Sequence, residues 1–381
     1  MKKNQIRKFK NIYGSGTIRS GGSLICNLLS THKDVIILID ILHFFRQIYK
    51  KYEPIYKKSN LYKLSGDLSI FLKYRKNINI DKKVFFKNLI KKKPKKYSDV
   101  YDSLLQTFSL LIPQKKIIAE YAGGEWRKIG KFLSFNKKNI AFQITRDPRG
   151  MMSSWKKTTF SRGYKYLNSI FNWIDSIDYA LRYKKKYSSE RFLLIKFEDI
   201  HQNPANSSNK LCNFLGIKMD KNMLITKKWK RLLNNNFTYV NVSAYNSKSV
   251  YGFSVRRINS WKNNLKDWEV ALIEYLCESR MKKIGYKVYK KNLNLYKKGL
   301  NIMRQDSLLK KRLKIFLTKN KGTHEKLNDP SKPKNWAVTD NTKRKIRNIS
   351  TKFINSQDYK NYLKELKIIK EESKLVTMNH F

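Results

Sequence analysis

The sequence predicts an α/β protein in which helices flank a parallel sheet, and two observations lead to this fold class. Short, mostly apolar runs recur along the chain, as they do in strands whose two faces are both covered. Segments of helix length separate the runs, so parallel strands joined by crossover helices are the simplest arrangement. The runs occupy residues 9–14, 115–121, 139–145 and 191–197.

Helical sequence follows each of these runs. The first run, FKNIYG, leads into the loop Ser15 to Ser20 and then into a segment with an apolar stripe at helical spacing. The members of this stripe are Leu24, Ile25, Leu28 and Leu29. The fourth run leads through Asn203-Pro204 into another helical stretch. The chain therefore repeats the order strand, loop, helix.

We expect one α/β domain over residues 1–286, closed by a helix that contains Trp261 and Trp268 and ends near Gly285. A Lys-rich helical insertion without a strand candidate interrupts this domain at about 53–112. We expect the insertion to cap the substrate cleft.

The last part of the chain, residues 287–381, is expected to form a Lys-rich helical extension. Helical patterns cover about 290–317 and 342–373, and a polar linker joins them at about 320–341. Docking, self-association and contact with a carrier are all open roles for this extension.

The composition bounds the function without naming it. Of 381 residues, 41% are hydrophobic and 13% aromatic, which excludes wholesale disorder. Lys and Arg number 83 against 28 Asp and Glu, so the formal net charge of +55 would attract any polyanion, including nucleic acid. The basic residues are spread along the chain, and Lys is abundant together with Asn, Ile, Tyr and Phe, as in proteins from AT-rich coding sequences. Charge alone therefore does not identify the partner.

The cysteines and histidines predict neither a disulfide framework nor a metal site. Cys26, Cys212 and Cys277 lie far apart without a CxxC pair, which favours buried thiols in a reducing compartment. The five histidines show no metal-ligand spacing. No apolar stretch of about 18 residues and no signal-peptide pattern occur, so we expect a cytoplasmic protein without a transmembrane segment. The oligomeric state stays open.

The sharpest local signal is the loop GSGTIRSGGS at residues 14–23, between an expected strand and an expected helix. Backbone N–H groups at such a position form a cradle for phosphate. The spacing of Gly16 and Gly21 matches GxxxxG, but Gly22 stands where a nucleotide-binding P-loop has Lys, while Ser23 keeps the hydroxyl. Arg19 supplies a guanidinium that can fork onto two anionic oxygens. The alternative is a Gly-rich turn with an exposed arginine.

A second signal, TRDPRGMMSSW at residues 145–155, follows the third run. Asp147 is expected to cap a helix whose first position is Pro148. Ser154 comes two helical turns after the cap, so Arg146 and Ser154 can hold one phosphate at the sheet edge where α/β proteins bind ligands. The alternative is an ordinary capped helix.

Together these motifs resemble the sulfotransferase family. Residues 18–24 resemble the loop that grips the 5′-phosphosulfate, and residues 146–154 resemble the motif for the 3′-phosphate. Two further segments fit in order, residues 192–217 as the strand with its Tyr-Glu-Asp and Phe-Leu-Gly elements, and residues 258–265 as the C-terminal Trp-Lys-x-x-Leu element. The resemblance covers about residues 9–286.

This resemblance implies a fold akin to P-loop nucleoside kinases and a sulfuryl donor, 3′-phosphoadenosine 5′-phosphosulfate (PAPS). The acceptor would carry a hydroxyl or an amine, and the family generally uses no metal. Arg19 and Ser23 would stabilise the leaving oxygen at one end of the donor, and Arg146 and Ser154 would anchor the 3′-phosphate at the other end. The donor-binding residues implied are Arg19, Ser20, Gly21, Gly22, Ser23, Arg146, Ser154, Phe197 and Arg257.

Two residues are candidates for the general base. Asp40 stands alone in VIILIDILHFF, at the end of an expected strand, where apolar neighbours would make its carboxylate more basic. It lies 21 residues after Arg19, about where a Glu base occurs in related enzymes that act on protein tyrosines or glycans. A plain helix cap is the equal alternative for Asp40, and His43 is a weaker candidate base.

The sequence also departs from the family pattern. Gly22 replaces the first Thr of the loop, Phe197 replaces a common Tyr, and the Lys expected after Glu120 is missing. Catalysis then depends on Arg19 alone or on a substitute among Lys156, Lys157 and Lys248.

Three function classes remain from the sequence. The first is a PAPS-dependent sulfotransferase acting on a glycan, a peptide or a small metabolite. The second is a P-loop kinase or NTPase, which Gly22 disfavours. The third is a basic nucleic-acid-binding protein with a vestigial loop, although no obligatory nucleic acid is expected.

Overall fold

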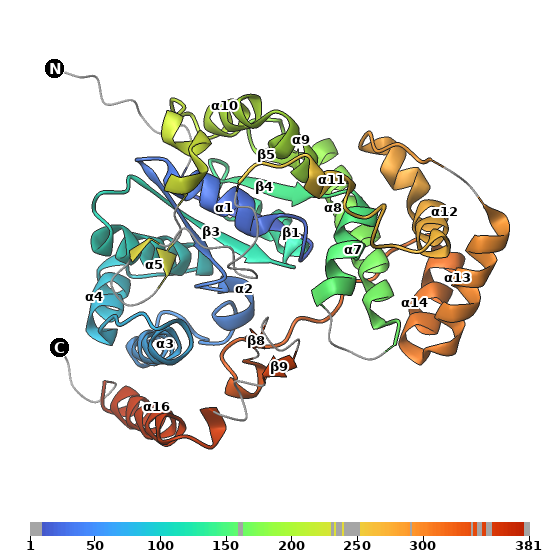
Figure 1. Cartoon of the computed structure of the whole chain (residues 1–381). Coiled ribbons are helices and arrows are strands. Elements are labelled where there is room, and N and C mark those ends of the chain that lie inside the picture. Colours follow the sequence, from blue (N-terminus) through green and yellow to red (C-terminus); the bar gives the residue numbers. More distant parts are fainter. Residues whose placement is uncertain are drawn as a thin grey trace.

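A computed structural model of the chain describes residues 10–158, 163–229, 232–233, 238–239, 252–289, 292–336, 338–340, 345–347 and 353–376. Five parallel strands form the central sheet in the order β2-β3-β1-β4-β5 (Figure 1). These strands are β1 (Ile12–Gly16), β2 (Val35–Ile39), β3 (Ile117–Gly123), β4 (Ile140–Thr145) and β5 (Phe192–Lys196). Helices flank the sheet, so the predicted fold class is confirmed.

The helices of the described residues are α1 (Gly22–Thr31), α2 (Phe44–Gln47), α3 (Lys58–Phe71), α4 (Lys82–Lys92), α5 (Tyr97–Leu111), α6 (Ile129–Phe135), α7 (Pro148–Thr158), α8 (Asn168–Lys186), α9 (Phe197–Gln202), α10 (Pro204–Phe214), α11 (Arg256–Asn259), α12 (Asp267–Lys283), α13 (Leu293–Gln305), α14 (Ser307–Lys319) and α16 (Gln357–Leu375). A π-helix, η1 (Leu72–Lys76), continues α3. Short 3-10 turns are η2 (Trp126–Lys128), η3 (Lys165–Leu167), η4 (Lys221–Leu224), η5 (Thr226–Lys228) and η6 (Pro333–Asn335). Two small antiparallel pairs are β6 (Leu232–Leu233) with β7 (Thr238–Tyr239), and β8 (Val338–Asp340) with β9 (Lys345–Arg347).

Both faces of the sheet are covered, which explains why its strands are so apolar. Every residue of β4 is buried. On one face the sheet packs against α1, α9 and α10, and on the other against α2, α5, α6 and α8. Figure 1 shows α1 and α10 on one side of the strands and α2 and α5 on the other. A third apolar cluster joins α7 and α8 to α12, α13 and α14.

The insertion at 53–112 is helical, as predicted, and consists of α3, η1, α4 and α5. It adds to the core beneath α2 through side chains such as Leu64, Phe85 and Leu104, all of them buried. The three cysteines are buried, as the sequence predicts.

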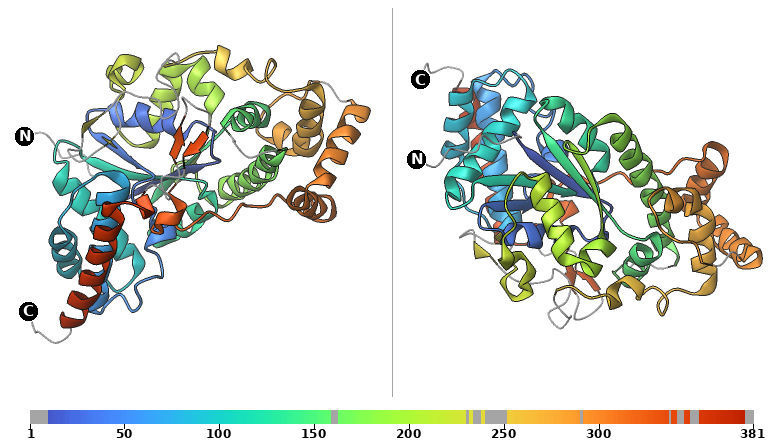
Figure 2. Two further views of the ribbon diagram at one scale, coloured as in Figure 1. Left: turned by 60° about the horizontal axis from the view of Figure 1, so that its bottom comes forward. Right: turned by 90° about the horizontal axis from the view of Figure 1, so that it is seen from above.

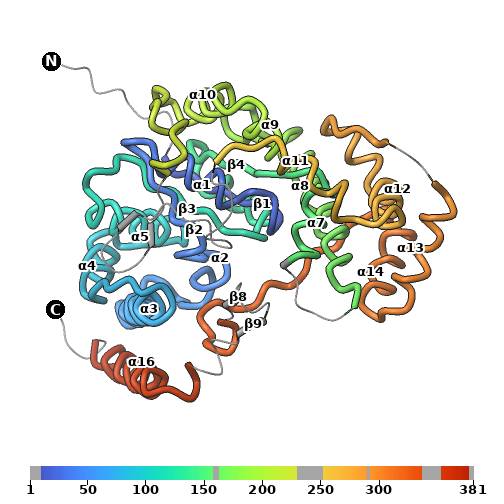
Figure 3. Tube along the Cα trace, in the orientation of Figure 1, coloured from blue at the N-terminus to red at the C-terminus, as the bar shows by residue number. Residues whose placement is uncertain are grey.

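The C-terminal extension has helices on both sides of a non-helical linker, as predicted, but its last helix begins later than expected. Residues 320–336 leave α14 as an extended segment that runs beside the sheet toward α2 and α3 (Figures 1 and 3). This segment ends on Trp336, which is 2% exposed and packs against Phe71, Phe353 and Tyr362. The helix expected from residue 342 begins at Gln357, after Ser356 caps it by accepting a hydrogen bond from the Tyr359 N–H.

The last helix, α16, lies along α3 (Figure 2). No helix in the described ranges combines the length and the apolar character needed to cross a membrane.

Candidate functional site

The order of the strands brings the candidate residues to one edge of the sheet. Because β1 lies between β3 and β4, and β2 pairs with β3, the carboxyl ends of these parallel strands stand side by side. The loop after β1 therefore lies between the end of β3 and the Arg146 motif after β4. Asp40, at the end of β2, lies next to Gly123 at the end of β3.

Two glycines let the loop approach its neighbours closely. A Cβ on Gly16 would lie 2.4 Å from the Ile144 carbonyl oxygen. Gly21 has a φ of 101°, and a Cβ there would lie 2.6 Å from the Phe197 ring. The helix α1 begins directly afterwards, so its first N–H groups face the loop as a phosphate cradle requires.

The loop hydroxyls have different environments. Ser20 is fully buried, and its hydroxyl is hydrogen-bonded to the Thr17 hydroxyl. Ser20 therefore braces the loop from within. Ser23 is partly exposed in the first turn of α1, where its hydroxyl can reach a ligand.

The two anion-binding motifs meet in space. Arg19 donates from Nε to the Ser154 hydroxyl at 2.9 Å, although the two residues are 135 positions apart. The sequence places Arg19 and Ser154 at opposite ends of the donor, whereas the structure puts their side chains in direct contact. One continuous cationic site therefore spans the loop and α7.

Arg146 is held by its neighbours, and its buried Nε donor is left without a partner among the described residues. Its guanidinium lies 4.2 Å from the centre of the Phe197 ring, and Nη2 donates to the Arg257 carbonyl at 2.8 Å. The Nε atom is buried and has no hydrogen-bond partner among the residues that the structure describes. Burial lowers the pKa of Arg146 to about 10, and the charge of Arg19 acts in the same direction. An anion placed here would satisfy the donor and both charges.

Phe197 and Arg257 take different places around Arg146. Phe197 is 6% exposed, and Gly21 and Arg146 cover its ring, so Phe197 forms the floor under the loop and the arginine. Arg257 lies on α11, partly exposed, and burial lowers its pKa. The neighbouring Arg256 is exposed.

The predicted cap of α7 is present and has a second role. The Asp147 carboxylate accepts from the Arg149 N–H at 2.9 Å. It also pairs with the Arg149 guanidinium, which bonds Glu274 on α12 as well. This buried ion cluster docks α7 on α12 and so fixes the helix that carries Ser154.

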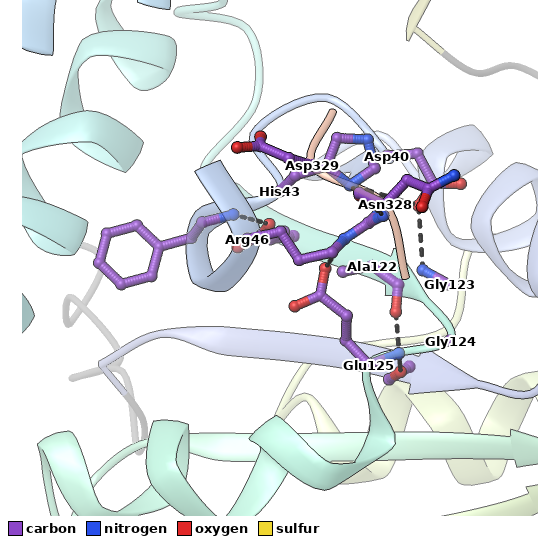
Figure 4. A network of polar contacts seen from close by, with 12 residues as sticks. Asp40, His43, Arg46, Ala122, Gly123, Gly124, Glu125, Asn328 and Asp329 are labelled. Carbon is purple, nitrogen blue, oxygen red and sulfur yellow. Dashed lines mark hydrogen bonds and ion pairs between the residues drawn. The ribbon is translucent and has the colours of Figure 1, made fainter. Parts of the chain in front are cut away.

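Asp40 does not lie in the apolar surroundings expected from its sequence neighbours. Its side chain is 42% exposed, and Oδ1 accepts from the Gly123 N–H at 2.9 Å. Asp40 therefore holds the end of β3 and does not cap α2. Figure 4 shows Asp40 beside Gly123 and His43.

His43 is buried and already hydrogen-bonded. Its Nδ1 accepts from Arg46 Nη2 at 2.6 Å, and Arg46 also donates to Glu125 and to the Asn328 carbonyl (Figure 4). Burial lowers the pKa of His43 well below its usual value, and the nearby charges of Lys76, Arg46 and Arg75 act in the same direction. His43 is therefore neutral in this arrangement.

Two cations near His43, of which Lys76 also interacts with Asp40, come from a segment without a sequence motif. Arg75 and Lys76 lie on the π-helix η1, a kind of helix that often occurs at functional sites. Burial lowers the pKa of Lys76 to about 8, against the opposing charge of Asp40. Arg75 stacks 5.9 Å from the Trp336 ring. The Lys-rich composition of the insertion hides such residues among many surface lysines.

Of the lysines proposed as substitutes for the missing family Lys, Lys156 is engaged elsewhere. Lys156 donates to Glu269 at 2.6 Å and to the Asn264 carbonyl, so it is directed toward α12. Lys157 is exposed. Lys248 lies outside the described residues.

The extended C-terminal segment closes one side of the loop. His324 Nε2 donates to the Gly124 carbonyl at 2.6 Å, and Leu327 packs on Gly124. Together with Thr17 and Ile18 they line a cavity of about 20 Å³. A larger hollow of about 330 Å³ lies between α3 and α16, away from the loop.

Residues 132–285 match the family described as "Sulfotransferase domain". Two curated relatives are similar in sequence. Carbohydrate sulfotransferase 1 of Danio rerio is 23% identical over 163 residues, which cover 38% of this chain and 37% of the relative. Carbohydrate sulfotransferase 3 of Tetronarce californica is 31% identical over 101 residues, which cover 26% of this chain and 21% of the relative. The chain thus spans well under half the length of these relatives.

Among solved structures, the sulfotransferase domain of the Synechococcus PCC 7002 olefin synthase is similar. Its TM-score is 0.50 at 13% sequence identity, over 76% of this chain and 99% of that domain. At this identity the likeness concerns the fold. It agrees with the family match, and the resemblance to sulfotransferases is confirmed.

Proposed function

We propose, on the premise that this chain carries a sulfotransferase domain, that it transfers the sulfuryl group of PAPS to a hydroxyl or an amine of an acceptor. The observation that carries the proposal is the contact between Arg19 and Ser154 beside the buried guanidinium of Arg146. One site thereby collects the cations that a donor with two separate anionic groups requires.

The residues present fit such a donor. Arg146 Nε is a buried donor without an acceptor among the described residues, and a phosphate oxygen would satisfy it. Arg146 and Arg257 would hold the 3′-phosphate, with Ser154 between this group and Arg19. Arg19, Ser23 and the first N–H groups of α1 would hold the phosphosulfate, whose bond to sulfur supplies the activated group when the donor is bound.

Asp40 would accept the proton of the acceptor. Its carboxylate is partly exposed at the edge next to the loop, and the Gly123 N–H fixes its orientation. His43 is a poorer base because its Nδ1 already accepts the hydrogen bond from Arg46. The proposed path takes the acceptor proton to Asp40 while Arg19 stabilises charge on the leaving oxygen.

The cations around Asp40 favour an acidic acceptor. Arg46, Arg75 and Lys76 all act on His43 electrostatically and so lie around the same point. Glycans bearing carboxylate or sulfate groups have this chemistry, and both curated relatives carry carbohydrate sulfotransferase in their names. We therefore propose an anionic glycan as the acceptor class.

The kinase alternative meets a steric obstacle. A Cβ on Gly22 would lie 2.4 Å from the Tyr121 hydroxyl, so a lysine at this position would displace that ring. The P-loop lysine that binds the phosphates of a nucleoside triphosphate would therefore not fit at position 22.

Titration calorimetry with adenosine 3′,5′-bisphosphate, the donor product, tests the proposal. The wild-type protein should bind it, and Arg146→Ala should weaken binding by about 10- to 100-fold, as expected for loss of a charge-assisted hydrogen bond. Arg182→Ala removes an exposed arginine from α8 and is the matched control for net charge. Absence of binding by the folded wild-type protein, or equal weakening in the control, would reject the proposed function.

A further inference from the structure

Gly22 and Tyr121 pack so closely that a side chain at position 22 would compete with the tyrosine ring for the same space. A Cβ on Gly22 would lie 2.4 Å from the Tyr121 hydroxyl oxygen, and 2.6 and 2.7 Å from two carbons of its ring. Tyr121 belongs to the apolar cluster on the side of the sheet that α1 covers, and Gly22 is the first residue of α1. The tyrosine therefore occupies the space that a threonine side chain at position 22 would need.

Tyr121 also lies beside the proposed base. It pairs in register with Gly14 of β1 and Ile39 of β2, and its carbonyl accepts from the Asp40 N–H at 2.8 Å. A Cβ on Gly123 would have Asp40 Oδ1 at 3.6 Å and the Tyr121 ring at 3.9 Å. The Tyr121 side chain thus reaches from the neighbourhood of Asp40 to the first turn of α1.

The phenol is suited to donate a hydrogen bond. Tyr121 is 3% exposed, and burial raises its pKa well above the usual value, with the charges of Cys26 and Asp40 acting in the same direction. The hydroxyl therefore stays protonated across the physiological range of pH. Its ring is held between β3 and α1, so little conformational freedom is lost when a ligand binds.

We propose that the Tyr121 hydroxyl donates a hydrogen bond to the sulfuryl group of the bound donor, in place of the hydroxyl missing at Gly22 and of the lysine missing after Glu120. This inference rests on the proposed function. In the transfer the bond from sulfur to the phosphate oxygen breaks, the bond from sulfur to the acceptor oxygen forms, and the acceptor proton goes to Asp40. Tyr121 keeps its own proton throughout and binds a group that is present in the donor and absent from the product.

The test compares the affinities of Tyr121→Phe for PAPS and for adenosine 3′,5′-bisphosphate by titration calorimetry. Loss of one hydrogen bond to an anionic group should weaken PAPS binding by about 10- to 100-fold, with the bisphosphate affinity within about twofold of wild type. Tyr13→Phe is the matched control, because it removes a buried hydroxyl from β1 that has no hydrogen-bond partner among the described residues. It should change neither affinity.

The outcomes separate the two proposals. If the wild-type protein binds no bisphosphate, the proposed function fails and the inference fails with it. If wild type binds both ligands and Tyr121→Phe does so equally well, only the inference is wrong. Equal weakening of both ligands would move the contact from the sulfuryl group to the 5′-phosphate and would also overturn it.

A steric experiment tests the packing of Tyr121 against Gly22, on which the proposal depends, and it does not require PAPS. Gly22→Thr alone should collide with Tyr121 and abolish bisphosphate binding, whereas Gly22→Thr combined with Tyr121→Ala gives the new side chain room and should recover it. Binding by the single variant at the wild-type level would show that the two residues do not compete for the same space. Thermal unfolding of each variant shows that it is folded.

Discussion

The stability of this protein should depend on pH through one buried carboxyl group, Glu120. Its side chain is fully buried on β3, and Oε1 accepts from the Phe44 N–H at 3.0 Å, which ties α2 to the sheet. Burial raises the pKa of Glu120 to about 8, against the opposing hydrogen bond from Phe44 and with the charge of Glu125 adding to the rise.

The sign and the size of this pH dependence follow from the difference between the pKa of Glu120 in the folded chain and in the unfolded chain. The unfolded value is 4.5, so the unfolded chain loses this proton first as the pH rises. The stabilisation is fully present below about pH 4.5 and is lost as the pH rises toward about 8. From this group alone, the free energy of unfolding should fall by about 3 to 4 kcal/mol between about pH 5 and pH 8.

Urea denaturation of wild type and Glu120→Gln at several pH values measures this contribution. Glutamine keeps an oxygen for the Phe44 N–H but does not titrate, so the difference in unfolding free energy between the two proteins should change by that amount. Glu190→Gln, in the exposed turn before β5, is a matched control and should follow the wild-type curve. Parallel curves for wild type and Glu120→Gln would refute the reasoning.

Two further variants test parts of the fold that support the site. Arg149→Met leaves Asp147 and Glu274 buried without their cation, so the free energy of unfolding should fall by about 3 to 5 kcal/mol. Urea denaturation measures this loss, and a loss under about 1 kcal/mol would contradict the role of the ion cluster. Trp336→Ala removes a side chain that packs on Phe71 and holds the C-terminal segment. It should cost about 3 to 5 kcal/mol and speed tryptic cleavage in residues 320–336, and an unchanged digestion pattern would argue against that packing.

The sheet could be predicted because its strands are covered on both faces. Each of the four apolar runs identified in the sequence became a strand, since a strand without a wet face carries apolar residues at nearly every position. Asp40 likewise marked the end of β2, because a lone charge ends such a run. The C-terminal boundaries were less accurate, because Lys-rich sequence has helical propensity whether or not a helix forms, and α16 begins only where Ser356 caps it.

Part of the site was also readable from local sequence. Gly21 favours glycine because its φ is 101° and a Cβ there would lie 2.6 Å from the Phe197 ring. Asp147-Pro148 indicates the start of a helix, because Asp caps it and Pro fits its first position. Both signals lie within a few residues of chain. The roles assigned to Arg19, Arg146, Ser154, Phe197 and Arg257 stay predictions until the donor product is titrated.

The sequence by itself determined the strands, the phosphate-type loop and the capped helix, because each depends on residues that are neighbours in the chain. Only the tertiary structure decided which residues from distant parts of the chain contact each other. The contact of Arg19 with Ser154 depends on β1 pairing with β4, and that of Gly22 with Tyr121 depends on β1 pairing with β3. Strand order and the path of residues 320–336 are set by packing between distant segments, and packing of this kind leaves no periodic trace in the sequence.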